Sequence, residues 1–147
     1  MTRIDFYVLP GAVVRERQST ACRLAEKAYR LGHRVYLQTS MSQDDATLDD
    51  LLWTFKQNSF VPHARWQGDD DTGVPVLIGH ETPPPACSDV LINRAESIPD
   101  AYERFARIVE IVDNDEACRE AGRRRYRFYR DRGYVPMTHK LASGDPP

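Results

Sequence analysis

The first forty residues switch between two hydrophobic periods, and this pattern restricts the fold more than any other part of the chain. Residues 3–9, RIDFYVL, are rich in β-forming residues and are followed by Pro10-Gly11. Residues 14–31 carry apolar side chains at helical spacing and end at Gly32, and a second strand pattern covers 34–40. A strand, a helix and a strand joined by short turns form a βαβ unit with parallel strands. The chain is therefore expected to fold as an α/β protein.

The rest of the chain continues this alternation without an internal repeat. Ser42 and Asp45 have the spacing of a capping box, and the proline-containing, acidic segment 59–73 is predicted to be a loop. We expect a single domain over residues 1–140, with a mostly parallel sheet of about five strands flanked by four helices, and a disordered tail over 141–147. Beyond residue 40 the expected helices cover 43–56, 98–105 and 115–132, and the expected strands cover 73–80, 89–95 and 107–113.

Nucleotide-binding proteins share this architecture, but the chain lacks the residues that usually hold phosphates. The first strand–helix connection, LPGAVVRERQS, has one glycine, whereas a dinucleotide site needs GxGxxG and a phosphate loop needs GxxxxGK[ST]. We therefore expect a Rossmann-like fold without a nucleotide site, with no cofactor and no catalytic residue. The pairs Asp44-Asp45 and Asp49-Asp50 are expected on the solvated face of a helix near its N-terminus, and Asp69–Asp71 at a loop tip. An enzyme acting on a small molecule stays open as an alternative.

The cysteine and hydropathy patterns narrow the class of protein further. Cys22, Cys87 and Cys118 are odd in number and form no CxxC motif, which argues against a disulfide framework and a zinc site. Cys22 lies beside apolar residues and is expected in the core. No apolar run reaches transmembrane length, and charged residues interrupt the N-terminal stretch too early for a signal peptide. A cytoplasmic protein without a metal and without membrane contact is expected.

The strongest functional signal lies in the last helical segment. Residues 119–134, REAGRRRYRFYRDRGY, carry seven arginines against two acidic residues, whereas the whole chain has a net charge of −2. Arg125 falls within the apolar stripe of this helix, where we expect a carboxylate or backbone carbonyls to pair with it. Like charges at helical spacing repel, so a row of them is tolerated more readily when an anionic partner binds there. On a helical wheel this row consists of Arg119, Arg123, Arg127 and Arg130, with Tyr126 at its border.

Three explanations fit the arginine row: a solvated helix face, a nucleic-acid site, or a site for an acidic peptide. Nucleic acid is usually held by basic residues spread along a groove and by exposed aromatic platforms. A compact patch on an otherwise acidic body favours a short acidic peptide, and Tyr126 with the strand end at Val112 would supply an apolar pocket beside it. Direct binding of single-stranded nucleic acid through the basic helix stays open as the alternative.

Several segments together resemble the chi subunit family of bacterial DNA polymerase III holoenzyme. Their order and spacing agree with the family over nearly the whole chain. The GDDDTG loop, the PPPACS segment and the LASGDPP end have no counterpart in that pattern. The segments that carry the resemblance are FYVL, LGHRVYLQ, LDDLLWTF followed by SFVPH, GVPVLI, DVLIN, IVEIVD and RRRYRFYRDRGY.

The resemblance implies a non-catalytic accessory subunit of the clamp-loader complex in DNA replication. Such proteins bind the acidic C-terminal tail of single-stranded DNA-binding protein, which ends in Pro-Phe, and they contact DNA only through their partners. Carried over by position, Arg123 would bind the terminal carboxylate of the tail. Arg119 and Arg127 would face its aspartates, and Tyr126 and Val112 would line a pocket for its phenylalanine.

The resemblance implies a second binding surface for psi, a small partner subunit that connects chi to the loader. Phe60, Val61, Pro62 and His63 match the region that contacts psi, and Trp53 lies nearby in the sequence. The alternative is that Trp53 and Phe60 only pack this loop onto the domain.

Overall fold

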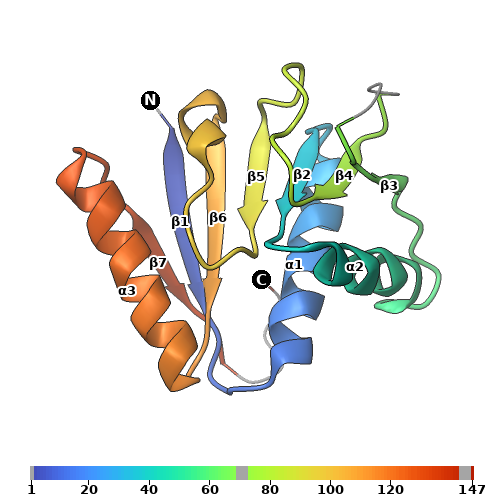
Figure 1. Ribbon diagram of the computed structural model, residues 1–147. Coiled ribbons are helices and arrows are strands. Elements are labelled where there is room, and N and C mark those ends of the chain that lie inside the picture. The colour runs from blue at the N-terminus through green and yellow to red at the C-terminus, as the bar shows by residue number, and fades with distance from the viewer. Residues whose placement is uncertain (1, 69–72, 143–146) are drawn as a thin grey trace.

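The computed structural model describes residues 2–68, 73–142 and 147. Within these ranges, seven strands form one sheet in the order β3-β4-β2-β5-β6-β1-β7, and every neighbouring pair is parallel (Figure 1). The expectation of an α/β domain with a parallel sheet is confirmed, although the sheet has seven strands instead of about five. The elements are β1 (Arg3–Val8), α1 (Val14–Arg30), β2 (Val35–Gln38), α2 (Ser42–Thr54), β3 (His63–Arg65), β4 (Val76–Gly79), β5 (Val90–Asn93), the 3₁₀ helix η1 (Asp100–Arg104), β6 (Arg107–Val112), α3 (Glu116–Asp131) and β7 (Met137–Lys140).

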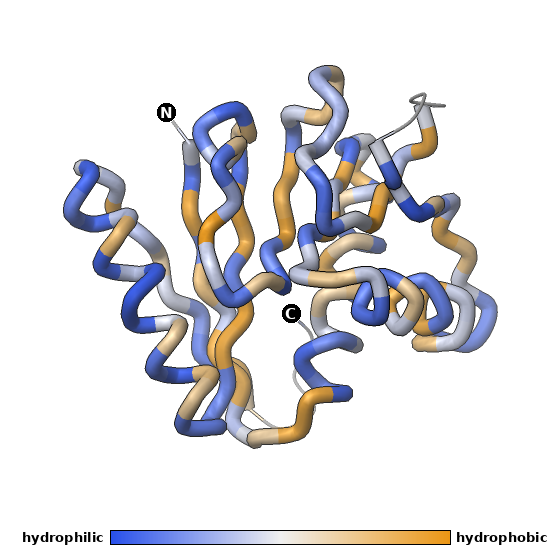
Figure 2. Tube along the Cα trace, viewed as in Figure 1, coloured by the Kyte–Doolittle hydropathy of each residue, from blue (hydrophilic) through white to orange (hydrophobic). Residues whose placement is uncertain are grey.

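Both faces of the sheet are buried, because α1 and α2 cover one face and α3 covers the other (Figure 1). Successive residues of a strand point to opposite faces. In β1, Ile4 and Phe6 join the core cluster on the α3 side, and Tyr7 joins the cluster on the α1 and α2 side. A strand buried on both faces needs a continuous apolar run, and all four residues are buried in each of β2, β4 and β5. Orange parts of the central strands in Figure 2 mark their apolar residues, although β2 and β5 each end in a polar residue, Gln38 and Asn93.

The first and last helices follow the sequence prediction within two residues at each end. Both end in a Schellman motif built on a glycine in the left-handed region. Gly32 has φ +86° at the end of α1, where His33 N donates to Ala28 O at 3.0 Å. Gly133 has φ +89° at the end of α3, where Tyr134 N donates to Tyr129 O at 3.1 Å. The predicted core position of Cys22 is also confirmed.

The predicted capping box of α2 is wrong. The N-cap residue is Met41, which makes no side-chain hydrogen bond to the helix, and Ser42 is already helical. Asp45, predicted on the solvated face, is only 1% exposed. Its carboxylate accepts a hydrogen bond from the Thr39 hydroxyl and lies 2.7 Å from Nδ1 of His80. Thr39 and His80 follow the adjacent strands β2 and β4, so a contact between distant segments, which leaves no local signal, buries Asp45.

The sequence does not predict β3 and β7, which are the two edge strands of the sheet. Their side chains are exposed or half-buried, so neither segment shows an alternating apolar pattern. β7 pairs with β1 through its backbone, and Nε2 of His139 lies 2.8 Å from Oδ1 of the buried Asp5. Burial acts to raise the pKa of Asp5, but hydrogen bonds with His139 and Arg107 outweigh it and keep this pKa below its usual value. The expected helix at 98–105 is the shorter 3₁₀ helix η1.

The expected C-terminal tail begins with a residue that is bonded to the sheet. Leu141 belongs to the expected tail, yet its backbone N–H donates to Val8 O at 2.9 Å. Residues 143–146 of that tail and the Asp69–Asp71 loop lie outside the described residues. No helix in the described part of the chain has the length and apolar composition needed to cross a membrane.

Candidate functional site

α3 positions the arginine row, and its N-terminus is fixed by a side-chain cap. The carboxylate of Asp115 accepts a hydrogen bond from Cys118 N at 3.0 Å. Gly122 lies on the buried face of the helix, and a Cβ at this position would lie 2.4 Å from Cγ1 of Val112. Glycine therefore lets α3 approach β6 more closely than any other residue would.

Arg125 is paired in the core, as the sequence predicts. Its Nε donates to Oε1 of Glu110 at 2.8 Å, and its Nη1 donates to the backbone oxygen of Glu96 at 2.9 Å. The fully buried Glu110 also accepts from the Tyr129 hydroxyl at 2.8 Å and from Asn93 Nδ2 at 3.1 Å. Burial, followed by the charge of Glu110, raises the pKa of Tyr129. Arg125 thus neutralises a carboxylate in the core and is unavailable to a ligand.

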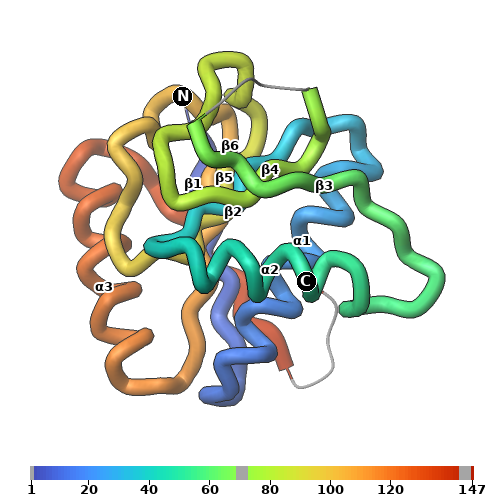
Figure 3. The backbone as a smooth tube through the Cα atoms, turned by 45° about the vertical axis from the view of Figure 1, so that its right-hand side comes forward, coloured from blue at the N-terminus to red at the C-terminus, as the bar shows by residue number. Residues whose placement is uncertain are grey.

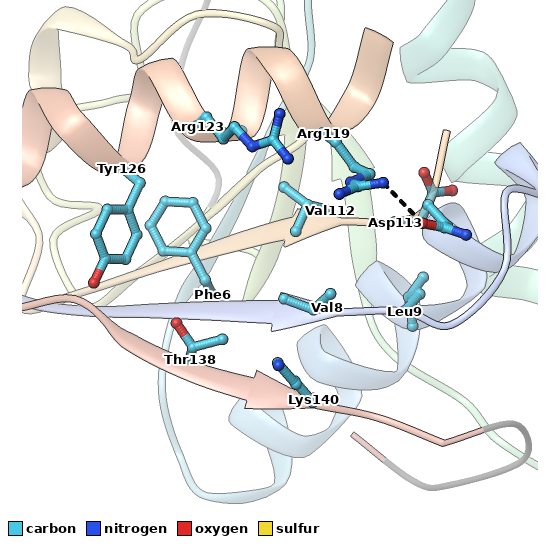
Figure 4. A pocket seen from close by; sticks show the side chains of 12 residues that line it. Phe6, Val8, Leu9, Val112, Asp113, Arg119, Arg123, Tyr126, Thr138 and Lys140 are labelled. Atoms are coloured by element: carbon cyan, nitrogen blue, oxygen red, sulfur yellow. Dashed lines mark hydrogen bonds between the residues drawn. The ribbon is translucent and has the colours of Figure 1, made fainter. Parts of the chain in front are cut away.

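The neighbouring border of α3 forms one wall of a pocket of about 380 Å³ (Figure 4). Side chains of β1 and β6 form an apolar floor, and cations stand on two sides of it. Figure 4 shows Arg119 and Arg123 on the helix and Lys140 on β7, across the floor. The lining residues are Phe6, Val8, Leu9, Val112, Asp113, Asn114, Arg119, Gly122, Arg123, Tyr126, Thr138 and Lys140.

The cations of this pocket have few partners of their own. Arg119 Nη1 donates to Oδ1 of Asn114 at 3.2 Å, the bond drawn in Figure 4. Arg123 is 59% exposed, and within the described residues it pairs only with the exposed Glu120, at 3.7 Å, an interaction that contributes little in water. Asp113, at the rim, is engaged by Nη1 of Arg17 at 2.7 Å. The pocket therefore offers positive charge to an anionic ligand.

An aromatic pair closes one end of the pocket. The ring centroids of Phe6 and Tyr126 lie 5.3 Å apart, with an angle of 59° between the ring planes. Phe6 also makes an edge contact with the buried Tyr129, at 6.1 Å, which holds its ring in place. A ligand ring entering beside Val112 would meet Tyr126 as a tilted neighbour, an arrangement that aromatic pairs favour.

The structure brings together four of the five residues expected to bind an acidic tail. Arg119, Arg123, Tyr126 and Val112 line the pocket, whereas Arg127 is exposed on α3 outside the lining. Eight of the lining residues are not predicted from the sequence as site residues, and four of these eight lie on the strands β1 and β7. A signal existed for two of them, because β1 and β6 pair in parallel with Val8 opposite Val112, and Phe6 shares that face. The four on β1 and β7 are Phe6, Val8, Thr138 and Lys140, and the other four are Leu9, Asp113, Asn114 and Gly122.

A second group of predicted residues lies at the opposite edge of the sheet, next to α2 and β3 (Figure 3). Trp53 is 55% exposed and Phe60 is 62% exposed, and their ring centroids lie 5.8 Å apart. Trp53 also contacts the ring of His63 at 4.5 Å. Val61 is buried in the core and Pro62 is half-buried. The loop is thus packed onto the domain through Val61, and the two large rings remain outside.

Similarity to known proteins decides the family. Residues 1–137 match the family model described as DNA polymerase III chi subunit, HolC. The chain belongs to this chi subunit family. The resemblance seen in the sequence is therefore confirmed, and as a chi-family protein the chain is an accessory subunit for DNA replication.

Individual chi subunits match over almost their whole length. DNA polymerase III subunit chi of Pseudomonas aeruginosa is 41% identical over 141 residues, which cover 96% of this chain and 98% of that protein. Subunit chi of Haemophilus influenzae is 29% identical, over 93% of this chain and 96% of that protein. Subunit chi of Escherichia coli is 27% identical, over 91% and 95% respectively.

The fold of this chi-family protein is shared beyond the family. The crystal structure of T4 UvsW matches with a TM-score of 0.67 at 10% sequence identity, over 96% of this chain and 42% of that one. At such low identity the likeness concerns the fold alone.

Proposed function

We propose that this chi-family protein is a non-catalytic accessory subunit that binds the acidic C-terminal tail of single-stranded DNA-binding protein and links it to the DNA polymerase III clamp-loader complex. The single observation that carries the proposal is the pocket between α3 and β7, with its apolar floor and its cations. A short acidic chain that ends in an apolar residue has the shape and charge to fill it.

Each part of the tail has a counterpart in the pocket. Arg123 takes the terminal carboxylate, because a guanidinium forms two parallel hydrogen bonds with a carboxylate. The terminal phenylalanine ring packs between Val112 and Tyr126. Arg119 and Lys140 attract the aspartates from opposite sides of the floor. Lys140 is an addition from the structure, whereas Arg127, outside the lining, contributes only long-range attraction.

The chemistry predicts moderate affinity. Exposed ion pairs contribute about 0.2–1 kcal/mol each, and burying one phenylalanine contributes about 1.5–3 kcal/mol. After the cost of ordering a flexible tail, a Kd of about 1–10 μM is expected. An oligomeric partner with several tails would raise the effective affinity without any new contact.

Direct binding of single-stranded nucleic acid is supported less well. Binding of this kind uses aromatic rings exposed along a basic groove. On α3, Tyr126 lies in the pocket wall, and the ring of Phe128 is covered by the guanidinium of Arg132 at 3.5 Å. The net charge of the chain is −2, which repels a polyanion beyond the basic patch.

Calorimetric titration with two peptides tests the proposal. The first is a nine-residue acidic peptide ending in Pro-Phe, and the second lacks the final phenylalanine. We expect micromolar binding of the first peptide, and a loss of at least tenfold either without the phenylalanine or in Arg123→Ala. Arg130→Ala is the matched control, since Arg130 lies on the same helix outside the pocket lining and should keep full affinity. Equal affinity for both peptides would reduce the pocket to a nonspecific electrostatic site and would favour nucleic acid as the ligand.

We propose a second role for the exposed pair of Trp53 and Phe60, which fits the psi partner subunit. Two large rings that are more than half exposed and in mutual contact are typical of an interface core. Co-purification with psi tests this role. Phe60→Ser should abolish the complex, whereas Leu31→Ser, which removes another exposed apolar side chain, should not. Both variants should bind the acidic peptide normally, and unchanged recovery of psi with Phe60→Ser would refute this role.

A further inference from the structure

A separate cavity of about 340 Å³ lies at the carboxyl edge of the sheet. Residues that follow β2 and β5 border it, together with the first turns of α3 and Arg17 from α1. β2 and β5 are neighbours, but the chain leaves β2 toward one edge of the sheet and β5 toward the other. In parallel α/β sheets, ligands bind outside the carboxyl ends of the strands at such a reversal point.

Arg94, which directly follows β5, is the unusual residue of this cavity. Its Nε is shielded from solvent and has no hydrogen-bond partner among the described residues. A guanidinium nitrogen that is withdrawn from water without a hydrogen-bond partner is costly, and an anion would offset that cost. Burial lowers the pKa of Arg94, and the charges of Arg17 and Arg125 lower it further, against a smaller opposing effect of Cys118 and Glu110. Arg94 is therefore a half-buried cation whose Nε has no partner within the described ranges, and it lies beside two arginines that are themselves paired.

The nearby carboxylates are already engaged. Asp113 holds Arg17 at 2.7 Å, and Glu110 holds Arg125 at 2.8 Å. Asp115 caps α3 through its bond with Cys118 N. The remaining acidic residue of the lining, Glu96, has a carboxylate that is 79% exposed and lies 3.6 Å from Arg124. None of these four carboxylates forms an ion pair with Arg94 within the described ranges.

We propose that this cavity binds a phosphate-class oxyanion through Arg94, while Arg17 and Arg125, which also line it, stay in their ion pairs with Asp113 and Glu110. A planar guanidinium matches two oxygens of a phosphate group. The first turn of α3 also borders the cavity through Ala117, so the positive end of the helix dipole faces it, although Cys118 N is already bonded to Asp115. In other α/β proteins the backbone N–H groups of a glycine-rich loop bind the phosphate, whereas here the Arg94 side chain would bind it. A search for glycine motifs therefore does not detect this site. The cavity is larger than a phosphate group alone, so free phosphate and the phosphate of a mononucleotide are both possible sources.

Alkylation of Cys118 provides a direct readout in the unaltered protein. Cys118 is half-buried and lines the cavity, whereas Cys22 and Cys87 are fully buried and serve as internal controls. We expect inorganic phosphate to slow modification of Cys118 by N-ethylmaleimide at least threefold, relative to chloride at equal ionic strength. An equal rate in phosphate and chloride would overturn the proposal.

Arg94→Met tests the role of the guanidinium, because methionine is a long unbranched side chain without charge. The variant should lose the protection of Cys118 by phosphate and should melt at the same or a higher temperature in phosphate-free buffer. Arg123→Met is the matched control and should keep the protection, since Arg123 lines the other pocket. Protection that persists in Arg94→Met would assign the effect to another site and overturn the proposal. If this variant does not fold, the alkylation rates of the unaltered protein decide the question alone.

A parallel series with adenosine monophosphate separates the two sources of phosphate. If adenosine monophosphate protects Cys118 at a concentration at least tenfold below that of inorganic phosphate, the nucleoside also binds in the cavity. Protection at similar concentrations would assign the site to the phosphate group itself. Protection by neither compound would overturn the proposal.

Discussion

Arg123 and Arg125 are two residues apart on α3, yet their surroundings are opposite. The side chain of Arg125 is 7% exposed and bonds to Glu110 and to a backbone oxygen. The side chain of Arg123 is 59% exposed, and the carboxylate that it pairs with, Glu120, is itself exposed to water. A shift of two residues turns a helical side chain by about 200°, so the neighbours, and not the residue type, decide what each arginine does.

The difference separates the two tasks of one helix. Its inner face supplies packing and one neutralised charge, so that α3 has a fixed position on β6. Its pocket face keeps two cations available beside an apolar floor. Gly122 belongs to both faces, because it lies at the contact of α3 with Val112 and also lines the pocket. Variants that affect one face at a time can test this division.

The largest effect is expected for Arg125→Met. Glu110 would keep its bonds to Tyr129 and Asn93 but would lose the cation that neutralises it. Leaving a buried charge unpaired costs about 3–5 kcal/mol in the free energy of unfolding. Urea denaturation measures this loss. Arg123→Met is the control and should change the free energy of unfolding by less than about 0.5 kcal/mol. Equal stability of the two variants would show that the buried face and the pocket face of α3 do not have different tasks.

Gly122→Ala should have the next largest effect. Alanine favours a helix interior by up to about 1 kcal/mol over glycine, but its Cβ would overlap Val112. Overpacking costs about 1–3 kcal/mol, so we expect a net loss of stability together with weaker peptide binding, because α3 or Val112 must move. Denaturation and calorimetry on one sample measure both effects. A more stable variant with normal peptide affinity would show that the close approach is not needed.

Salt should weaken peptide binding to the exposed cations of the pocket, because screening acts less on a buried ion pair such as Arg125–Glu110. Raising sodium chloride from about 50 mM to about 500 mM shortens the screening length severalfold. We expect the peptide affinity to fall about fivefold, because the pairs it forms are partly exposed. Titrations over this range measure the change, and an affinity independent of salt would mean that the arginines of the pocket do not contact the acidic residues.

The smallest effect is expected for Arg127→Met. Arg127 is exposed outside the pocket lining, so only screened, long-range attraction is lost. The peptide affinity should fall less than about twofold, or about 0.4 kcal/mol, in the same titration. A tenfold loss would extend the site along α3 and would support the position first inferred from the sequence.

The sequence predicts the parts of the fold that local patterns encode. The helices and the inner strands follow from their hydrophobic periods, and Gly32 marks the end of α1 correctly. The edge strands β3 and β7 have no such period, because their side chains face water. The burial of Asp45 was missed because its partners lie on other elements.

The pocket shows the same division. Arg119, Arg123 and Tyr126 were found because one helical wheel orders them. Lys140 was missed because β7 is held beside β1 by backbone pairing and by the contact between His139 and Asp5, residues far apart in the chain. The cavity around Arg94 was missed for a similar reason, since Arg17, Arg94 and Arg125 come together only when three elements meet.

The most direct test of the central claim is a double-mutant cycle between Arg123 and the carboxyl end of the peptide. The peptide affinity is measured for the unaltered protein and for Arg123→Met, each with the free carboxylate and with a C-terminal amide. We expect each single change to weaken binding about tenfold, or about 1.4 kcal/mol. Both changes together should weaken binding no more than either alone, because they remove the same contact. Losses that simply add would show that Arg123 does not bind the terminal carboxylate and would contradict the account.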